Sequence, residues 1–510
     1  MHGRESRTVS FDRLGVLIYN LRDIMTDDLA GVAARGAKLL TFAQVAKFAI
    51  YLLGLVTLSR LLDPSAFGIV AIATAFVGVA EYLRDFGLST AAVRERYLSV
   101  DQRDALFWTN LGLGFFFTIV ISLLAPLLAA AFGIPELSGV LALLSLTFVI
   151  NGFGAQYRAS LNRDQQYSRI AIVDILGPAF GLVVALLAVF AGASYWSLAI
   201  QFLTNSLVTS GLLVFFGRWR ARRPRRVTGV RRLYTFGANY AVSQLVGYLG
   251  NNVHTIALGL FGTPASVGVY TRSFQFALGT LDQAKAPALT VALPSLARVS
   301  HDLPRMSSFL LRGQLLIAYV TLPLAAFMFA GSGPIVNVLL GRQWVNAGPV
   351  IAVLALAGAL QQLATVSSWL FVTAGNANGL RNYMFLSTSL KIVGVLSFVS
   401  YGAFGVAIGY TAAVAVAWPI AIIWSTRSSG ARTAPLLVQG IRLLAVGIVA
   451  AAAGKLIALS LALSSTWVEI FVAFGVVAAT YLLSAVFAVF RADFRQVARV
   501  VRLSVRRKSE

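Results

Sequence analysis

Long apolar runs alternate with short segments rich in charge, glycine or proline along almost the whole chain. The uninterrupted runs at residues 111–132 and 467–490 reach the length of about 20 apolar residues that a helix needs to cross a bilayer. We therefore expect an all-α polytopic membrane protein. The pattern predicts fourteen spanning helices, at residues 39–59, 67–86, 105–130, 137–155, 170–190, 195–216, 234–260, 267–291, 309–330, 347–372, 382–400, 403–424, 436–458 and 467–490.

The composition agrees with this prediction and excludes a soluble protein. Of the 510 residues, 58% are hydrophobic and 12% are charged, and 19 Asp and Glu are too few to cover so large an apolar core. The chain has no cysteine, and its three histidines are dispersed at His2, His254 and His301, which argues against a metal site or a His-dependent triad. No P-loop occurs, and the polar loops are too short for an extramembrane active site. We expect no enzyme activity and no cofactor.

The net charge of +23 is concentrated in alternate connections between the predicted helices. Thirty-three of the 42 Lys and Arg fall in the two tails and in every second loop, whereas the intervening loops hold only Arg60 and Arg342. This asymmetry is what the positive-inside rule predicts for cytoplasmic loops. It indicates an even number of spans with both termini cytoplasmic. The basic residues then serve topology and contact anionic lipids, and no nucleic-acid partner is expected.

The most basic segment, 218–232, divides the chain into two halves. Six predicted spans precede it, six follow, and two more trail. A short echo supports duplication, because residues 63–68 (DPSAFG) after span one resemble residues 263–268 (TPASVG) after span seven. Parallel repeats of this kind usually form a binding site at the midplane between them. We expect an N-terminal extension (1–36), an N-lobe (37–217), a linker (218–232), a C-lobe (233–426), two added helices (427–490) and a basic cytoplasmic tail (491–510).

Charges inside the predicted spans are the main candidates for function, because burying one costs several kcal/mol. Lys47 and Lys391 lie near the middle of their spans. Arg272 lies close enough to a helix end to reach the headgroups, which leaves a structural role open for it. Lys285 lies three residues after Asp282, so an ion pair is the alternative to a functional role.

Two acidic residues, Glu81 and Asp85, share one face of span two with Arg84 between them. They form either a self-neutralising cluster or a site that couples transport to H⁺ or Na⁺. Span seven carries Asn251 and Asn252, which either bond neighbouring helices or line a water-filled cavity. Central lysines and amides suit an anionic substrate such as a phosphate or diphosphate. The substrate-binding candidates are therefore Lys47, Lys391, Lys285, Arg272, Asn251 and Asn252, and the ion-coupling candidates are Glu81, Asp85 and Asp282.

A set of short motifs resembles polysaccharide-transport proteins of the Wzx type, which belong to the MOP flippase superfamily with MATE exporters and lipid II flippases. The motifs occur in order over residues 30–430 and include 60–70 (RLLDPSAFGIV), 83–89 (LRDFGLS), 107–111 (FWTNL), 135–137 (PEL), 195–199 (YWSLA), 218–220 (RWR), 268–270 (GVY) and 341–344 (GRQW). The resemblance implies two six-helix lobes in a V that opens alternately to each side. It also implies an oligosaccharide substrate on an undecaprenyl diphosphate carrier.

Together these observations favour a flippase that moves lipid-linked oligosaccharide repeat units across the bacterial inner membrane for exopolysaccharide or O-antigen synthesis. A polysaccharide polymerase and a chain-length regulator are the expected protein partners. The alternatives are a cation-coupled antiporter of the MATE type and a lipid II flippase. An exporter of cationic drugs would be expected to hold unpaired carboxylates deep in a lobe, and here deep lysines outnumber deep acids. The extension 1–36 has apolar residues at helical spacing, so it forms either an interfacial helix or a disordered leader.

Overall fold

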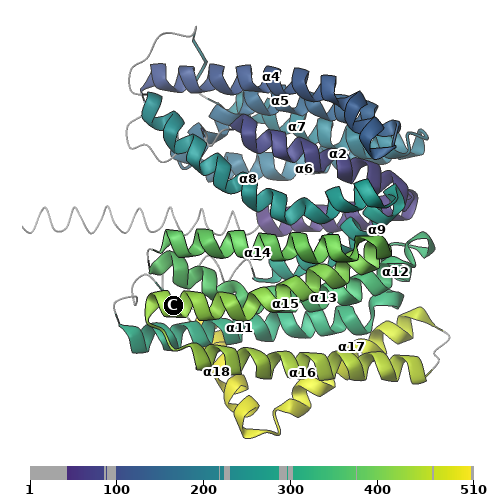
Figure 1. The fold of residues 1–510 in the computed structure, drawn as a ribbon, viewed down its shortest axis with the longest axis vertical. Coiled ribbons are helices and arrows are strands. Elements are labelled where there is room, and N and C mark those ends of the chain that lie inside the picture. Colours follow the sequence, from purple (N-terminus) through teal and green to yellow (C-terminus); the bar gives the residue numbers. More distant parts are fainter. Residues whose placement is uncertain are drawn as a thin grey trace, which may run out of the picture.

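The computed structural model describes residues 43–85, 88, 99–217, 219–222, 230–285, 296, 302–374, 376–461 and 465–506, and within these ranges it contains helices and no strand. Figure 1 shows the helices running side by side in two groups, one above the other. The predicted all-α membrane fold is confirmed. The extension 1–36 lies outside the described residues.

The first group contains the helices of the N-terminal half. They are Ala43–Leu61, α2 (Pro64–Asp85), α4 (Val100–Phe132), α5 (Glu136–Arg163), α6 (Tyr167–Phe190) and α7 (Tyr195–Phe216). The helix ends carry local signals. Ser99 and Gln102 form a capping box at the start of α4, and Gly133 ends that helix in the left-handed conformation that glycine adopts without strain.

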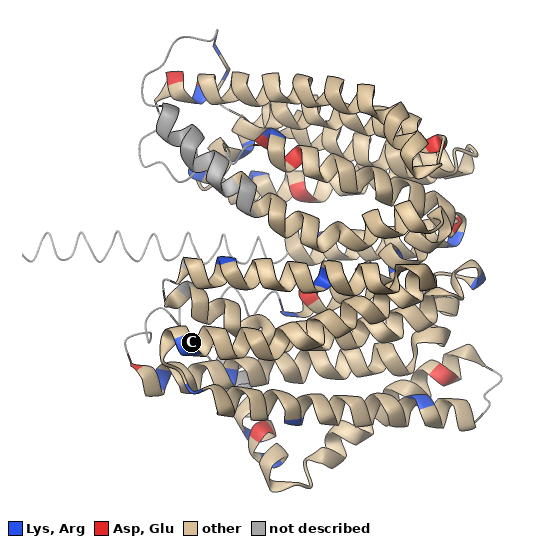
Figure 2. Cartoon of the chain, viewed as in Figure 1, with Lys and Arg blue, Asp and Glu red and all other residues tan. Residues whose placement is uncertain are grey.

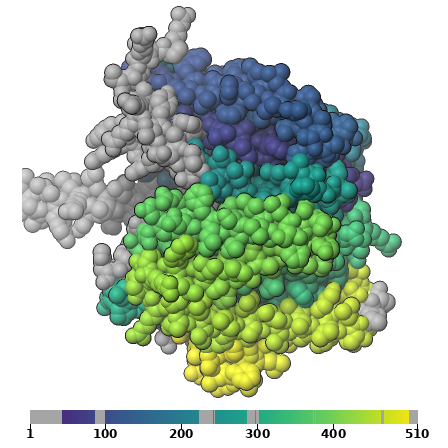
Figure 3. Space-filling model, in the orientation of Figure 1, coloured from purple at the N-terminus to yellow at the C-terminus, as the bar shows by residue number. Residues whose placement is uncertain are grey.

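The remaining helices form the second group and the contact between the groups. They are α8 (Val230–Phe261), α9 (Pro264–Phe274), the π-helical turn η1 (Gln275–Gly279), α11 (Leu303–Ala330), α12 (Ser332–Leu339), η2 (Arg342–Trp344), α13 (Ala347–Thr373), α14 (Ala377–Phe398), η3 (Val399–Tyr401), α15 (Gly402–Ser429), α16 (Thr433–Ser460), α17 (Thr466–Ser484) and α18 (Ala488–Arg506). On the face seen in Figure 3, α8 (teal) lies between the blue helices of the first group and the green α14 of the second.

Eleven segments of the described chain are long and apolar enough to cross a membrane, and the one at Asn378–Ser429 contains both α14 and α15. A helix overlaps each of the fourteen predicted ranges, but α8 and α9 do not meet the criteria of length and hydropathy. The amides and glycines of α8 lower its hydropathy. The count of fourteen spans is therefore not confirmed.

The carboxyl-terminal end differs from the prediction. The last predicted span, 467–490, ends at Ser484, and a separate helix, α18, begins at Ala488 and continues through residues that we expected to form a plain tail. Its apolar side packs on the bundle, where Phe494 meets the Tyr319 ring at 5.0 Å and Asp493 pairs with Arg442. In Figure 1, α17 and α18 form a V at the lower edge. The apolar run at residues 467–490 includes the start of this amphipathic helix, so the prediction joined it to the spanning helix before it.

Candidate functional site

A cavity of about 650 Å³ lies between the two groups of helices. Its wall comes from Ala43–Leu61, α2, α6 and α7 on one side and from α8, α9 and the first residue of η1 on the other. A cavity at this boundary changes shape whenever the groups move relative to each other. The predicted location of the binding site, between the two halves, therefore coincides with a real cavity.

Two cations line this cavity, Lys47 from the first group and Arg272 from the second. The Arg272 guanidinium stacks on the Phe67 ring at 3.9 Å and donates a hydrogen bond of 3.0 Å to Gln275 Oε1. Neither cation has a carboxylate partner among the described residues, and no Asp or Glu belongs to the described cavity wall. Arg272 points into the cavity instead of reaching the headgroups. The cavity is therefore positively charged.

Neutral amides complete the polar lining. Asn251 and Asn252 on α8 both line the cavity, as predicted for a polar wall, and Asn252 donates to the Tyr248 carbonyl oxygen at 2.9 Å. Opposite them, α7 contributes Gln201 and Asn205. Our sequence reasoning missed these two residues. Their signal in the sequence was two amides one helical turn apart in a predicted membrane span that holds no charged residue.

Lys391 does not belong to the cavity wall. Its ammonium group lies 5.4 Å from the centre of the Tyr410 ring, and the Tyr410 hydroxyl accepts a hydrogen bond of 2.7 Å from Gln361. His254 does line the cavity, and its ring lies 6.1 Å from the same tyrosine. Lys391 is thus placed behind the wall, in a polar and aromatic cluster within the second group.

The acidic candidates lie away from the cavity wall, and two of them are in ion pairs. Asp282 pairs with Lys285 at 2.7 Å and accepts a second bond from Gln362, so these two site candidates neutralise each other. Glu81 pairs with the buried Arg84 at 2.8 Å and accepts a bond from Asn151. Asp85 is the last residue of α2 and does not line the cavity. Figure 2 shows that acidic and basic residues occur in both groups of helices.

One end of the boundary between the groups is sealed by the two copies of the sequence echo. The first turns of α2 and α9 cross so closely that a Cβ added to Gly68 would overlap the Pro264 carbonyl oxygen, and one added to Gly268 would overlap that of Pro64. Only glycine permits this approach of two backbones. The repeat noticed in the sequence is therefore a physical contact between the halves.

Near the point where α2 and α9 cross, side chains of each group cap helix ends of the other group. Gln343 and Trp344 donate to the Ser59 carbonyl oxygen at 2.9 and 2.7 Å, while Arg60 donates to the carbonyls of Val338 and Leu339 at the end of α12. The last backbone carbonyls of a helix lack hydrogen-bond partners within that helix. Here each group of helices supplies the donors for helix-end carbonyls of the other group. Trp344 is fully buried against the Phe67 ring. Arg60 and Arg342 both lie at this seal. They are the two cations found in the loops that otherwise lack Lys and Arg.

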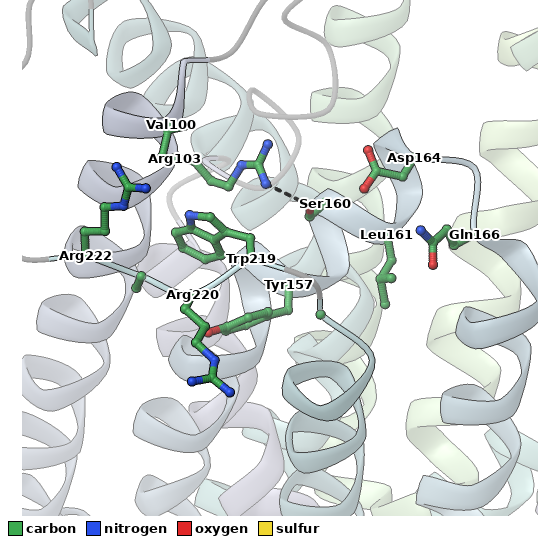
Figure 4. A pocket seen from close by; sticks show the side chains of 12 residues that line it. Val100, Arg103, Tyr157, Ser160, Leu161, Asp164, Gln166, Trp219, Arg220 and Arg222 are labelled. Atoms are coloured by element: carbon green, nitrogen blue, oxygen red, sulfur yellow. Dashed lines mark hydrogen bonds between the residues drawn. The ribbon is translucent and has the colours of Figure 1, made fainter.

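A second cavity, of about 640 Å³, is formed by the first group and the start of the linker (Figure 4). Trp219 lies beside the Tyr157 ring at 5.3 Å and beneath Arg103, whose guanidinium is 5.6 Å from the indole centre. The Trp108 indole donates to the Arg222 carbonyl oxygen at 2.7 Å. These contacts fix residues 219–222 to the first group. Because the described wall belongs to one group only, this cavity anchors the linker and offers no access from two sides.

Known proteins with similar sequences act in lipopolysaccharide and succinoglycan biosynthesis. The chain is 23% identical over 382 residues to the lipopolysaccharide biosynthesis protein WzxC of Escherichia coli, which covers 74% of this chain and 77% of the relative. It is 24% identical over 346 residues to the succinoglycan biosynthesis transport protein ExoT of Rhizobium meliloti, covering 68% and 69% of the two chains.

Solved structures share the fold. The lipid II flippase MurJ in an inward closed conformation superposes with a TM-score of 0.70 at 11% identity and covers 88% of this chain and 98% of its own. An inward-facing MATE family transporter of the MOP superfamily reaches 0.62 at 16% identity and covers 75% and 94%. A sequence profile described as polysaccharide biosynthesis protein matches residues 57–349, more than half of the chain. The chain belongs to this family of polysaccharide biosynthesis proteins.

Proposed function

We propose that the protein is a flippase that carries lipid-linked oligosaccharide repeat units across the membrane for the synthesis of a surface polysaccharide. The observation that carries this proposal is the cavity between the two groups of helices, which holds Lys47 and Arg272 but no described acidic residue. Two cations without a carboxylate partner among the described residues, in a cavity between membrane helices, favour an anionic ligand. The diphosphate that links a polyprenyl carrier, such as undecaprenol, to its sugars supplies that charge.

Transport proceeds by alternating access. The basic loops orient the chain with its termini in the cytoplasm, so the seal at Gly68 and Gly268 faces the periplasm. The diphosphate and its sugars enter the cavity from the cytoplasmic side, while the prenyl tail stays in the bilayer. Separation of the seal then exposes the head to the periplasm, where a polymerase and a chain-length regulator act on it.

The charge of the cavity distinguishes this function from that of a cation antiporter of the MATE type. An exporter of cationic drugs needs carboxylates facing its substrate, and the described wall has none. The similar solved structures are a flippase and transporters, in agreement with the prediction of a transport protein in place of an enzyme. Coupling to H⁺ or Na⁺ at Glu81, Asp85 or Asp282 remains a prediction, and the ion pairs of Glu81 and Asp282 require that any such coupling disrupt a pair.

The test removes the cavity cations one at a time and together. Lys47→Gln, Arg272→Gln and the double variant are expressed in a strain that lacks its own copy of the gene, and surface polysaccharide is measured. We expect each single variant to lose at least tenfold in polymer and the double variant to lose all of it, because each removes an attraction to the diphosphate. The lipid-linked precursor should accumulate in the same cells.

Lys455→Gln is the matched control, since Lys455 lies within α16 and outside the cavity wall. It should support normal polymer. Wild-type polymer in the double variant at equal protein level would contradict the proposed function. Drug sensitivity with normal polymer would instead identify an antiporter, and loss of viability with normal polymer would identify a lipid II flippase.

A further inference from the structure

The wall contributed by α7 differs in chemistry from the two cations. Gln201, Phe202 and Asn205 occupy one face of this helix and all line the cavity. Gln201 has no hydrogen-bond partner among the described residues, and Asn205 Oδ1 accepts only a long bond of 3.4 Å from Thr209. The amide nitrogen atoms of both residues are therefore available to a ligand. Phe202 leaves 44% of its surface exposed beside them.

Close packing against α6 holds this face in place. A Cβ added to Gly177 would lie 2.7 Å from Asn205 Oδ1, and one added to Gly181 would lie 2.9 Å from the Gln201 carbonyl oxygen. Glycines at these two positions let α6 and α7 approach at the height of the two amides. The polar groups thus come from a rigid helix pair, which is the kind of support that a binding site requires.

An amide without a partner inside a membrane protein is costly, so a polar ligand or water must satisfy it. A phosphate is better served by Lys47 and Arg272, because charge-assisted hydrogen bonds are about twice as strong as neutral ones. A sugar hydroxyl is neutral and both donates and accepts, which matches the amide group of Asn or Gln. The apolar face of a sugar ring can pack on an exposed aromatic side chain.

We propose that Gln201, Phe202 and Asn205 form a sugar subsite that reads the sugar nearest the diphosphate. The proposal rests on the proposed flippase function and assigns separate parts of the substrate to separate parts of the cavity. The two cations hold the diphosphate irrespective of the sugar, and the α7 face discriminates among sugars. Asn251 faces the same cavity from α8 without a described hydrogen-bond partner and offers a further amide to the head.

The experiment measures binding of two matched probes to the purified full-length protein in detergent. One probe is a C20 prenyl diphosphate, and the other is the same lipid with one hexose on the diphosphate, prepared with glucose, galactose and N-acetylglucosamine. The variants are Gln201→Met with Asn205→Leu, which keep the side-chain volumes, and Arg272→Gln. Thr204→Val, on α7 but outside the cavity wall, is the control.

We expect the wild type to bind at least one sugar-bearing probe more tightly than the bare diphosphate. The α7 variant should lose about tenfold in affinity for that probe and none for the bare diphosphate, which also shows that it is folded. Arg272→Gln should weaken both probes equally, and Thr204→Val should weaken neither.

Equal losses for both probes in the α7 variant, or no loss for either, would overturn the sugar subsite. A wild type that binds all probes equally would also overturn it, while leaving the flippase function in place. Failure of the wild type to bind any diphosphate probe would overturn the proposed function and the subsite together.

Discussion

The two cations of the central cavity and three cations inside the groups of helices have opposite surroundings. Arg84, Arg158 and Lys285 each lie within 3 Å of a carboxylate, at Glu81, Asp174 and Asp282. Lys47 and Arg272 have no such partner among the described residues. Both sets lie in helices of the membrane region, where an unpaired charge is expensive. The difference indicates that the paired charges serve stability and the unpaired ones serve a ligand.

The largest effect on stability is expected at the most buried pair. Arg84 is only 3% exposed, so Glu81→Gln would remove the carboxylate that hydrogen-bonds to its buried guanidinium. We expect a loss of about 3 kcal/mol in the free energy of unfolding, at the lower end of the range for a broken buried ion pair because Glu81 itself is partly exposed. Thermal unfolding of the purified protein would measure it.

The double variant Glu81→Gln, Arg84→Met is the control, because it removes the buried charge along with its ion-pair partner. It should recover most of the lost stability. If the double variant were as unstable as Glu81→Gln, or if Glu81→Gln lost transport with unchanged stability, the pair would belong with the functional charges.

The smallest effect is expected at Lys285, whose partner Asp282 is half exposed and also accepts a bond from Gln362. Lys285→Gln should cost about 0.5 kcal/mol, the value of an i,i+3 pair on a helix surface, and should leave polymer synthesis near the wild-type level. Surface polysaccharide and unfolding temperature would be measured together. A tenfold loss of polymer from this variant would move Lys285 from the structural set to the substrate site.

Much of the fold follows from the sequence because hydropathy and charge are local properties. The apolar runs located the helices, and the DPSAFG and TPASVG echo indicated the duplication. The contact between the two copies became visible only in the structure. The predicted end of the last span was wrong because the amphipathic helix that starts at Ala488 begins with apolar residues. In the sequence these residues look like a continuation of the span before them.

The site was predicted only in part, because the direction of a side chain depends on packing between distant helices. Depth within a span placed Lys47 and Lys391 in one class, yet one lines the cavity and the other covers Tyr410. Arg272 was open to a headgroup role until the position of α9 against α2 showed it facing the cavity. A role for Lys391 in substrate contact stays a prediction.

Alternating access requires the seal at the first turns of α2 and α9 to open during each transport cycle. The chain contains no cysteine, so Leu61→Cys and Val345→Cys can be introduced beside Arg60 and Trp344 without altering the capping contacts. Both positions are exposed. Cells that carry the pair would be treated with a reducible, membrane-impermeant bifunctional thiol reagent, with each single cysteine as control. We predict that bridging stops surface polysaccharide synthesis and that a reductant restores it. Undiminished synthesis by fully bridged protein would contradict the account.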